Sequence, residues 1–142
     1  MSTPEENKTV ARNFYDAYNG DDLQGAFDTY IAQDLVNHTM GGAMSREVWM
    51  QSDVAGKAAM PDQTMTFLGQ AADGDKVFTH WILEGTHTGG DFMGQPASGK
   101  TIRLEAVAVD VIRDGQIVEH NAVGDFTALM SQLAGGQPPA AE

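Results

Sequence analysis

The chain has 142 residues and carries 8 Lys and Arg against 20 Asp and Glu, a formal net charge of −12. This length fits one domain with a sizeable core, and the negative charge argues against binding to nucleic acid or to an anionic membrane surface. The absence of cysteine excludes disulfides and thiolate chemistry; with neither a long apolar run nor a signal-peptide pattern, we expect a soluble, cytoplasmic protein.

Helical patterns occupy the first sixty residues. Thr3 with Glu6 forms a capping box that predicts a helix start. Apolar residues at helical spacing then predict three helices, over about 4–18, 22–31 and 45–59. Residues 34–38 lie between the last two and suggest a short extended piece.

The character of the chain changes after Pro61. Alternating and β-branched residues predict four strands, over 63–71, 76–87, 100–113 and 116–125. Asp114-Gly115 is a strong hairpin signal between the last two. A short helix over about 127–133 is expected after the final strand.

Helices followed by antiparallel strands predict an α+β fold. We expect the three N-terminal helices to pack on a curved four-stranded antiparallel sheet and to enclose a pocket for a small molecule. A single domain over residues 1–134 follows from this layout, with a disordered tail over 135–142.

One literal motif match is rejected. Residues 94–101 fit the phosphate-loop pattern G-x-x-x-x-G-K-[ST]. That motif needs a helix directly after it, because the helix N-terminus helps to hold the phosphates. Here a β-prone run, 102–109, follows. A surface turn is the better interpretation.

The last predicted strand carries the most informative polar residues. If it is regular, Asn121, Val123 and Asp125 share one face, while His120 and Ala122 share the other. Asp125 ends the strand immediately before a helix. It is therefore either the N-cap of that helix or an acid at the pocket wall.

The neighbouring strand has two largely apolar faces. Glu105 is the exception, and it either pairs with Arg103 or another cation at an edge, or provides a second acid in the pocket. The other face continues onto the last strand and is too apolar to leave in water, which predicts a homodimer. This set comprises Ile102, Leu104, Ala106, Ala108, Val118 and Ala122.

The four histidines are dispersed, and no two have the spacing of metal ligands, so we expect no metal. His38 and His87 each end an apolar stretch beside a glycine-rich loop, where strand ends often line a pocket mouth. Aromatic residues and one methionine are candidates for the pocket lining or the core: Phe14, Tyr18, Trp49, Trp81 and Met93.

The arrangement of motifs resembles the SnoaL-like polyketide cyclase (ester cyclase) family of the nuclear transport factor 2-like superfamily. The resemblance is carried by residues 84–89 (EGTHTG), 92–100 (FMGQPASGK) and 113–120 (RDGQIVEH), with Asp125. It implies a cone-shaped fold and a cofactor-free intramolecular aldol cyclisation. It also implies that Asp125 is the acid/base. Because His38 and His87 lie at strand ends near flexible glycine loops, we expect them to be the donors to the developing oxyanion.

The chain departs from that family at Asn121, where Trp is usual. We expect Asn121 and Glu105 to contact substrate and the substrate to differ accordingly. Two other readings stay open: a hydrolase or isomerase of the epoxide-hydrolase or ketosteroid-isomerase style, and a binding protein without catalysis.

Overall fold

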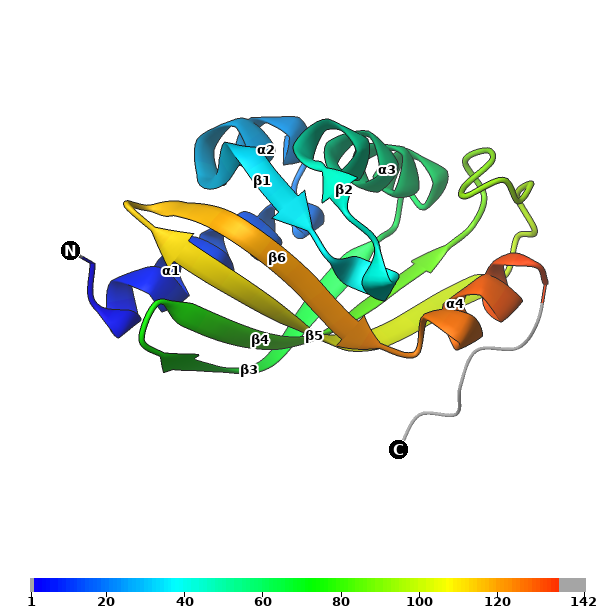
Figure 1. Cartoon of the computed structure of the whole chain (residues 1–142). Helices are drawn as coiled ribbons and strands as arrows, with labels where there is room; N and C mark the ends of the chain where they lie inside the picture. The colour runs from blue at the N-terminus through cyan, green and yellow to red at the C-terminus, as the bar shows by residue number, and fades with distance from the viewer. Residues whose placement is uncertain (1, 136–142) are drawn as a thin grey trace.

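The structure, a computed structural model, describes residues 2–135 (Figure 1). Its helices are α1 (Pro4–Asp16), α2 (Leu23–Tyr30), α3 (Arg46–Ala59) and α4 (Phe126–Leu133). Two 3-10 turns, η1 (Ala17–Asn19) and η2 (Thr39–Gly41), lie between them. The strands are β1 (Ile31–Asn37), β2 (Met44–Ser45), β3 (Thr64–Asp73), β4 (Lys76–Thr86), β5 (Thr101–Arg113) and β6 (Gln116–Gly124).

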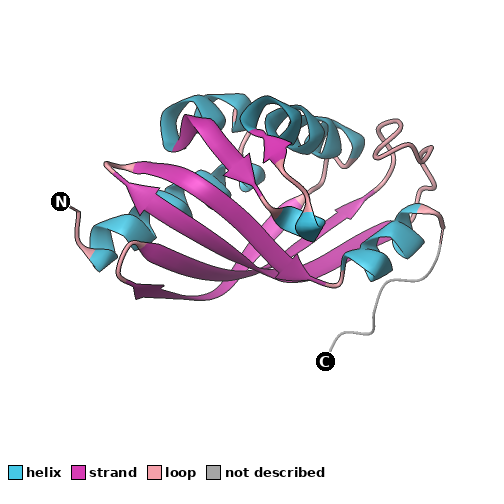
Figure 2. Cartoon of the chain, in the orientation of Figure 1, coloured by secondary structure: helices cyan, strands magenta, loops and turns pink. Residues whose placement is uncertain are grey.

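The strands form one curved sheet in the order β2-β1-β6-β5-β4-β3 (Figure 2). All neighbouring strands are antiparallel except β1 and β6, which are parallel. The α+β class and the four long strands are confirmed, but the sheet has six strands rather than four. The expected extended piece at 34–38 is β1, and it adds to the sheet because it pairs with β6.

The helices begin where the sequence places them. Thr3 accepts a hydrogen bond from the backbone N–H of Glu6 at 3.1 Å, and Ser45 accepts one from Val48 at 3.3 Å. Each cap satisfies a backbone donor that the helix itself leaves free and contributes about 1 kcal/mol. These caps fix where α1 and α3 start over the concave face of the sheet.

The apolar face proposed as a dimer interface is the core of the protein. Ile102, Leu104, Ala106 and Ala108 are at most 5% exposed and pack with side chains of the helices. The sequence argument chose the wrong face because both faces of β5 are apolar. The observation that predicted a homodimer therefore no longer supports one.

A bulge in β6 explains why regular alternation assigns its side chains to the wrong faces. Val111 pairs with Glu119 but Ile112 pairs with Ile117, so β6 carries one extra residue, Val118, at this point. A bulge reverses the alternation of side chains along a strand. As a result Ile117 and His120 both point inward, although regular alternation would separate them.

The C-terminal helix is anchored on the sheet by Gln132. Its side chain accepts from the backbone N–H of Arg103 at 2.6 Å and donates to the carbonyl of the same residue at 2.9 Å. This contact extends the domain to the end of α4. Most of the tail predicted over 135–142 lies outside the described residues.

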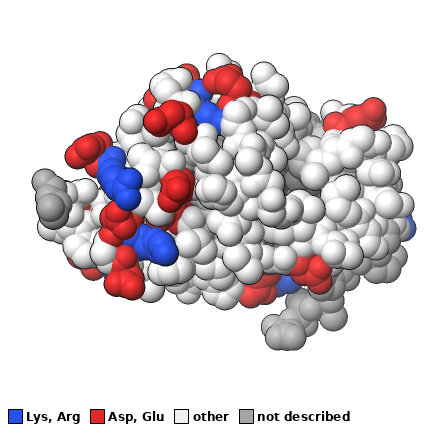
Figure 3. Space-filling view, viewed as in Figure 1, with Lys and Arg blue, Asp and Glu red and all other residues white. Residues whose placement is uncertain are grey.

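Charge is unevenly distributed over the surface. In the view of Figure 3, acidic side chains predominate and gather toward the end that holds α1, while the middle of this face is uncharged. None of the helices described is long and apolar enough to cross a membrane.

Candidate active site

A cavity opens between the concave face of the sheet and the helices. The hollow and the open solvent at its mouth together measure about 950 Å³. Its walls include residues of α1, α3, the strands β3 to β6, the loop after β4, and α4. Methionines line much of it: Met40, Met44, Met60, Met65 and Met93. Such flexible, polarizable side chains with aromatic neighbours suit an apolar, flat ligand.

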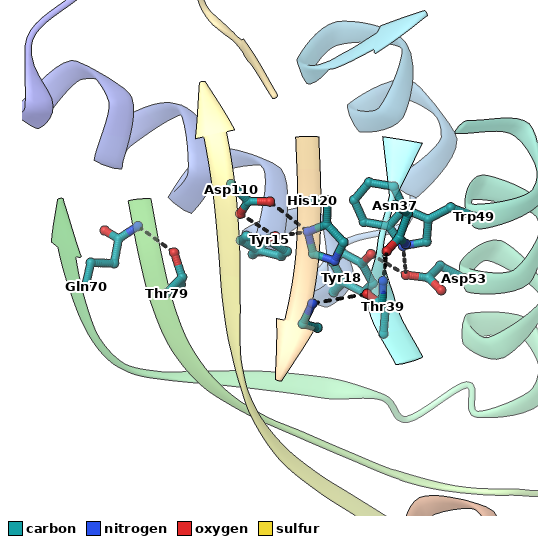
Figure 4. A network of polar contacts seen from close by, with 11 residues as sticks. Tyr15, Tyr18, Asn37, Thr39, Trp49, Asp53, Gln70, Thr79, Asp110 and His120 are labelled. Atoms are coloured by element: carbon teal, nitrogen blue, oxygen red, sulfur yellow. Dashed lines mark hydrogen bonds and ion pairs between the residues drawn. The ribbon is translucent and has the colours of Figure 1, made fainter. Parts of the chain in front are cut away.

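A buried polar cluster ends in this cavity at His120 (Figure 4). His120 Nδ1 lies 2.7 Å from Asp110 Oδ1, and the Tyr15 hydroxyl donates to Asp110 Oδ2 at 2.6 Å. The same hydroxyl lies 3.2 Å from His120 Nδ1. Asp110 is fully buried, so these two donors are what stabilise its carboxylate.

The cluster fixes the proton of the His120 ring. A carboxylate at Nδ1 holds the N–H there, because an ionised Asp110 can only accept. In the neutral ring the second nitrogen, Nε2, is then the acceptor, and it has no hydrogen-bond partner within residues 2–135. His120 therefore presents a proton acceptor to the cavity that it lines.

Tyr15 stays protonated in this setting. Burial raises the pKa of its phenol well above 10.0, and the adjacent Asp110 raises it further. The hydroxyl consequently acts as a permanent donor to Asp110.

Asp53 forms a second polar group at the cavity wall. Its Oδ2 accepts from the Tyr18 hydroxyl at 2.5 Å and from Trp49 Nε1 at 3.0 Å. Burial raises the pKa of Asp53, although the hydrogen bond from Tyr18 opposes this. Burial also raises the pKa of Tyr18 well above 10.0, so that phenol remains a donor.

Trp49 contacts both polar groups, His120 of the buried cluster and the Asp53 carboxyl. Its ring stacks on His120 with centroids 4.2 Å apart and an interplanar angle of 15°. Helical spacing places Trp49 and Asp53 on one face of α3, since residues four apart lie one turn apart. One side chain thus contacts both the histidine and the carboxyl.

The loop after β4 closes one side of the cavity. His87 is fully buried, and its Nε2 lies 2.6 Å from the carbonyl oxygen of Gly90. The backbone N–H groups of Thr88 and Gly89 donate to the carbonyl of Ala59, at 3.1 and 2.8 Å. These contacts hold Phe92 and Met93 of the loop against the cavity.

Several of the predicted residues meet at this cavity. Tyr18, Trp49, Trp81 and Met93 all line it, as the sequence suggested. Phe14 does not, because it is fully buried in the core against Phe27 and Trp49.

Two predicted contact residues face away from the cavity. Glu105 lies on the outer face of the sheet, 2.8 Å from His80 Nε2 and 3.9 Å from the Arg103 guanidinium. The paired reading of Glu105 is therefore confirmed. Asn121 also points outward, because the bulge puts its neighbours His120 and Ala122 on the inner face.

The three predicted catalytic residues are not brought together. Asp125 is exposed, lies outside the lining and accepts from the backbone N–H of Ala128 at 2.9 Å, which confirms the helix-cap reading. His38 is exposed near Glu119, at 4.0 Å. His87 is held inside the loop. A catalytic role for these residues stays a prediction that the geometry does not support.

Sequence reasoning missed Asp53, Asp110 and His120 as one site. Helical spacing from Trp49 could have suggested Asp53. To place Asp110 beside His120, one has to know the register of the hairpin, which pairs the two residues directly across β5 and β6. The Asp114-Gly115 turn alone would pair Asp110 with Glu119, and the extra residue Val118 shifts that pairing to His120.

Among the described residues, no three His, Asp or Glu side chains converge as they would around a metal ion. The absence of a metal or cofactor remains a prediction. The carboxyls of Asp53 and Asp110 are instead occupied by phenol, indole and imidazole donors.

Comparison with known proteins identifies the class to which this cavity belongs. The family model for the SnoaL-like polyketide cyclase matches residues 8–133, so the chain belongs to that family. A comparison with curated proteins gave no significant match.

Solved structures agree with this placement. IdmH of Streptomyces antibioticus, a candidate polyketide cyclase, is 30% identical, with a TM-score of 0.73 over 89% of this chain and 97% of its own. AclR of Streptomyces galilaeus, a candidate hydroxylase, is 25% identical, with a TM-score of 0.81 over 92% and 97%. A SnoaL-like protein of Jannaschia sp. CCS1, 18% identical, has a TM-score of 0.82 over 96% and 99% and shows the shared fold. The expected nuclear transport factor 2-like cone is thereby confirmed.

Proposed function

We propose that this protein is a cofactor-free acid/base enzyme that acts on a small apolar carbonyl compound. The leading reaction is intramolecular aldol cyclisation of a polyketide-type ester. The observation that carries the proposal is His120, which lines an apolar cavity with Nε2 while Asp110 and Tyr15 hold its other nitrogen.

This geometry suits removal of a proton from carbon. Nε2 of neutral His120 takes the proton next to the ester carbonyl, and the buried Asp110 carboxylate stabilises the imidazolium that forms. Tyr15 keeps Asp110 in place without competing for the proton, because its own phenol stays protonated. The resulting enolate carbon then attacks a ketone of the same molecule.

The cavity favours a neutral and flat substrate. Its lining is dominated by methionine and aromatic side chains, and in the part of the chain that the structure describes no Lys or Arg belongs to it. Glu84 is a carboxyl group at its wall, and its negative charge and the apolar lining both disfavour an anionic ligand. A methyl ester is therefore preferred over the free acid.

The second acid and the arginine that an epoxide hydrolase would need do not line the cavity. The epoxide-hydrolase hypothesis required Glu105 and Arg103 beside an acid in the pocket, and Glu105 lies on the outer face of the sheet. A binding protein without catalysis remains the competing function, because the same cavity could hold a ligand without reaction.

A deuterium-exchange experiment separates catalysis from binding. The probe is a methyl arylacetate with a β-diketone on the adjacent ring carbon, in which attack of the ester α-carbon on the distal ketone closes a six-membered ring. In D₂O, the enzyme should speed deuterium uptake at the ester α-carbon. The chain has two tryptophans and both line the cavity, so their fluorescence reports binding independently. Binding without exchange would identify a carrier instead.

A further inference from the structure

Ring closure needs a second proton transfer, to the alkoxide, besides the removal of the α-proton by His120. We infer that Asp53 is the general acid that protonates the alkoxide formed when the ring closes. This inference rests on the proposed function and deepens it, because it assigns the other half of the acid/base chemistry.

The two oxygens of Asp53 differ in their surroundings. Oδ2 already accepts two hydrogen bonds, from the Tyr18 hydroxyl at 2.5 Å and from Trp49 Nε1 at 3.0 Å. Neither group can accept a proton from Oδ2 in this arrangement, because the indole N–H only donates and the Tyr18 phenol already donates its proton to Oδ2. A proton on the carboxyl therefore belongs on Oδ1.

Oδ1 is the oxygen that remains available to a ligand. No hydrogen bond reaches it from any residue between 2 and 135, and Asp53 belongs to the lining of the cavity. A protonated Asp53 thus presents an O–H to bound substrate. Burial supports this state, since it raises the pKa of the carboxyl from the usual value for Asp.

The backbone beneath Asp53 is also held in place. The Lys57 ammonium, one turn further along α3, donates to the carbonyl oxygen of Tyr18 at 2.8 Å. This bond ties the turn that carries the Tyr18 phenol to the helix that carries Asp53. The carboxyl is consequently positioned by α3 and η1 together, as a general acid requires.

The base and the acid line the same cavity, and both contact Trp49 (Figure 4). The Trp49 ring stacks on His120 at 4.2 Å and its Nε1 donates to Asp53. His120 lies against the face of that ring and Asp53 at its Nε1 edge, so the two groups can act on different atoms of one substrate.

The proposed step balances. The α-proton moves to His120 Nε2, and the electron pair it leaves forms the new bond to the ketone carbon. The ketone π pair becomes an alkoxide, which takes the proton from Asp53 Oδ1. The product is a neutral tertiary alcohol, and transfer of the proton from imidazolium to the Asp53 carboxylate, through water after release, restores the enzyme.

The Asp53→Asn variant separates the two proton transfers. Asn accepts from Tyr18 and Trp49 through its oxygen, so the fold is conserved, but its amide cannot deliver a proton. With the probe above, we expect ester α-carbon exchange within threefold of wild type and ring closure slower by about 10²-fold or more. Asp34→Asn removes one exposed carboxylate from β1 and serves as the matched control, with both rates unchanged.

Three outcomes overturn the assignment in different ways. Ring closure at the wild-type rate in Asp53→Asn means that another group supplies the proton. An equal loss of exchange and ring closure means that Asp53 only positions substrate or His120. If the wild-type enzyme exchanges no ester α-proton, the proposed function itself fails and the acid role with it.

A substrate-free measurement tests the same carboxyl. The indole N–H signal of Trp49 in a ¹H–¹⁵N spectrum should shift as Asp53 titrates, with a midpoint above the ordinary value of about 3.9 for Asp. This titration should vanish in Asp53→Asn, while the signal of Trp81 serves as the internal reference. An identical Trp49 titration in both proteins would show that Asp53 holds no proton in the working range.

Discussion

Replacing Tyr15 with Phe probes the buried cluster behind His120. The variant removes the hydroxyl that donates to the fully buried Asp110 at 2.6 Å. Hydrogen bonds to a charged group contribute about 1.5–3 kcal/mol, and the cost should lie in the upper half of this range because water cannot replace the lost donor. With about 3 °C of Tm per kcal/mol for a domain near this size, the melting temperature should fall by roughly 6–9 °C.

Chemical and thermal unfolding at neutral pH measure this loss. Tyr30→Phe is the matched control: Tyr30 is half-buried, its hydroxyl has no hydrogen bond within the described residues, and its loss should cost less than about 0.5 kcal/mol. Equal stability of the two variants would show that the Tyr15–Asp110 bond does not stabilise the fold.

The same cluster predicts a pH dependence with a definite sign. Burial raises the pKa of Tyr15 in the folded state above its unfolded value near 10.0. Its contribution to stability is therefore complete below about pH 10 and is lost as pH rises toward the folded pKa. Wild type should lose stability more steeply than Tyr15→Phe above pH 10, and parallel curves would contradict the buried phenol.

Three further predictions follow from other parts of the fold. Asp125→Asn should keep full activity and stability because Asn also caps α4, whereas Asp125→Ala should lose about 1 kcal/mol of stability; a large loss of turnover in Asp125→Asn would restore the sequence-based assignment. Gly89→Ala should weaken the closing loop, since its Cβ would lie 2.1 Å from the carbonyl oxygen of Ala58, and unchanged probe affinity would argue against a closing role. We also propose that the outer face of the sheet makes a homodimer through half-buried or exposed apolar residues; light scattering at micromolar concentration should give twice 15.2 kDa, and a monomer would refute it. These residues are Phe78, Ile82, Val107, Val109 and Val123.

Much of the fold was accessible from local sequence signals. The cap at Thr3, the start of the helix predicted over 45–59 and the turn at Asp114-Gly115 depend on neighbouring residues only, and each lies where it was predicted. β1 was harder to predict because it is short and pairs in parallel with a strand some eighty residues away. Local periodicity carries no information about such a partner.

The site was harder to predict than the fold. The aromatic lining followed from the apolar faces of the helices, as Tyr18 and Trp49 show. The faces of β6 were exchanged, because one extra residue at Val118 turns His120 inward. A bulge depends on how two strands match in length and twist, so alternation along one strand does not reveal it.

Because the inner face of β6 carries His120, the candidate base also changes from a carboxylate to an imidazole. Asp125 suggested a carboxylate base at the end of a strand, while the structure places an imidazole backed by Asp110 in the cavity. Asp110 was not among the site residues that the sequence suggested. Its role depends on Tyr15, which lies 95 residues earlier in the chain.

The most direct test of the account is deuterium exchange at the ester α-carbon of the methyl arylacetate probe by His120→Asn. Asn keeps a donor for Asp110 near the position of Nδ1 but has no acceptor in place of Nε2. His80→Asn, which changes a histidine on the outer face of the sheet, is the control. We predict that His120→Asn exchanges at least about 10²-fold more slowly than wild type while His80→Asn is unchanged. Exchange at the wild-type rate in His120→Asn would contradict the assignment of His120 as the base.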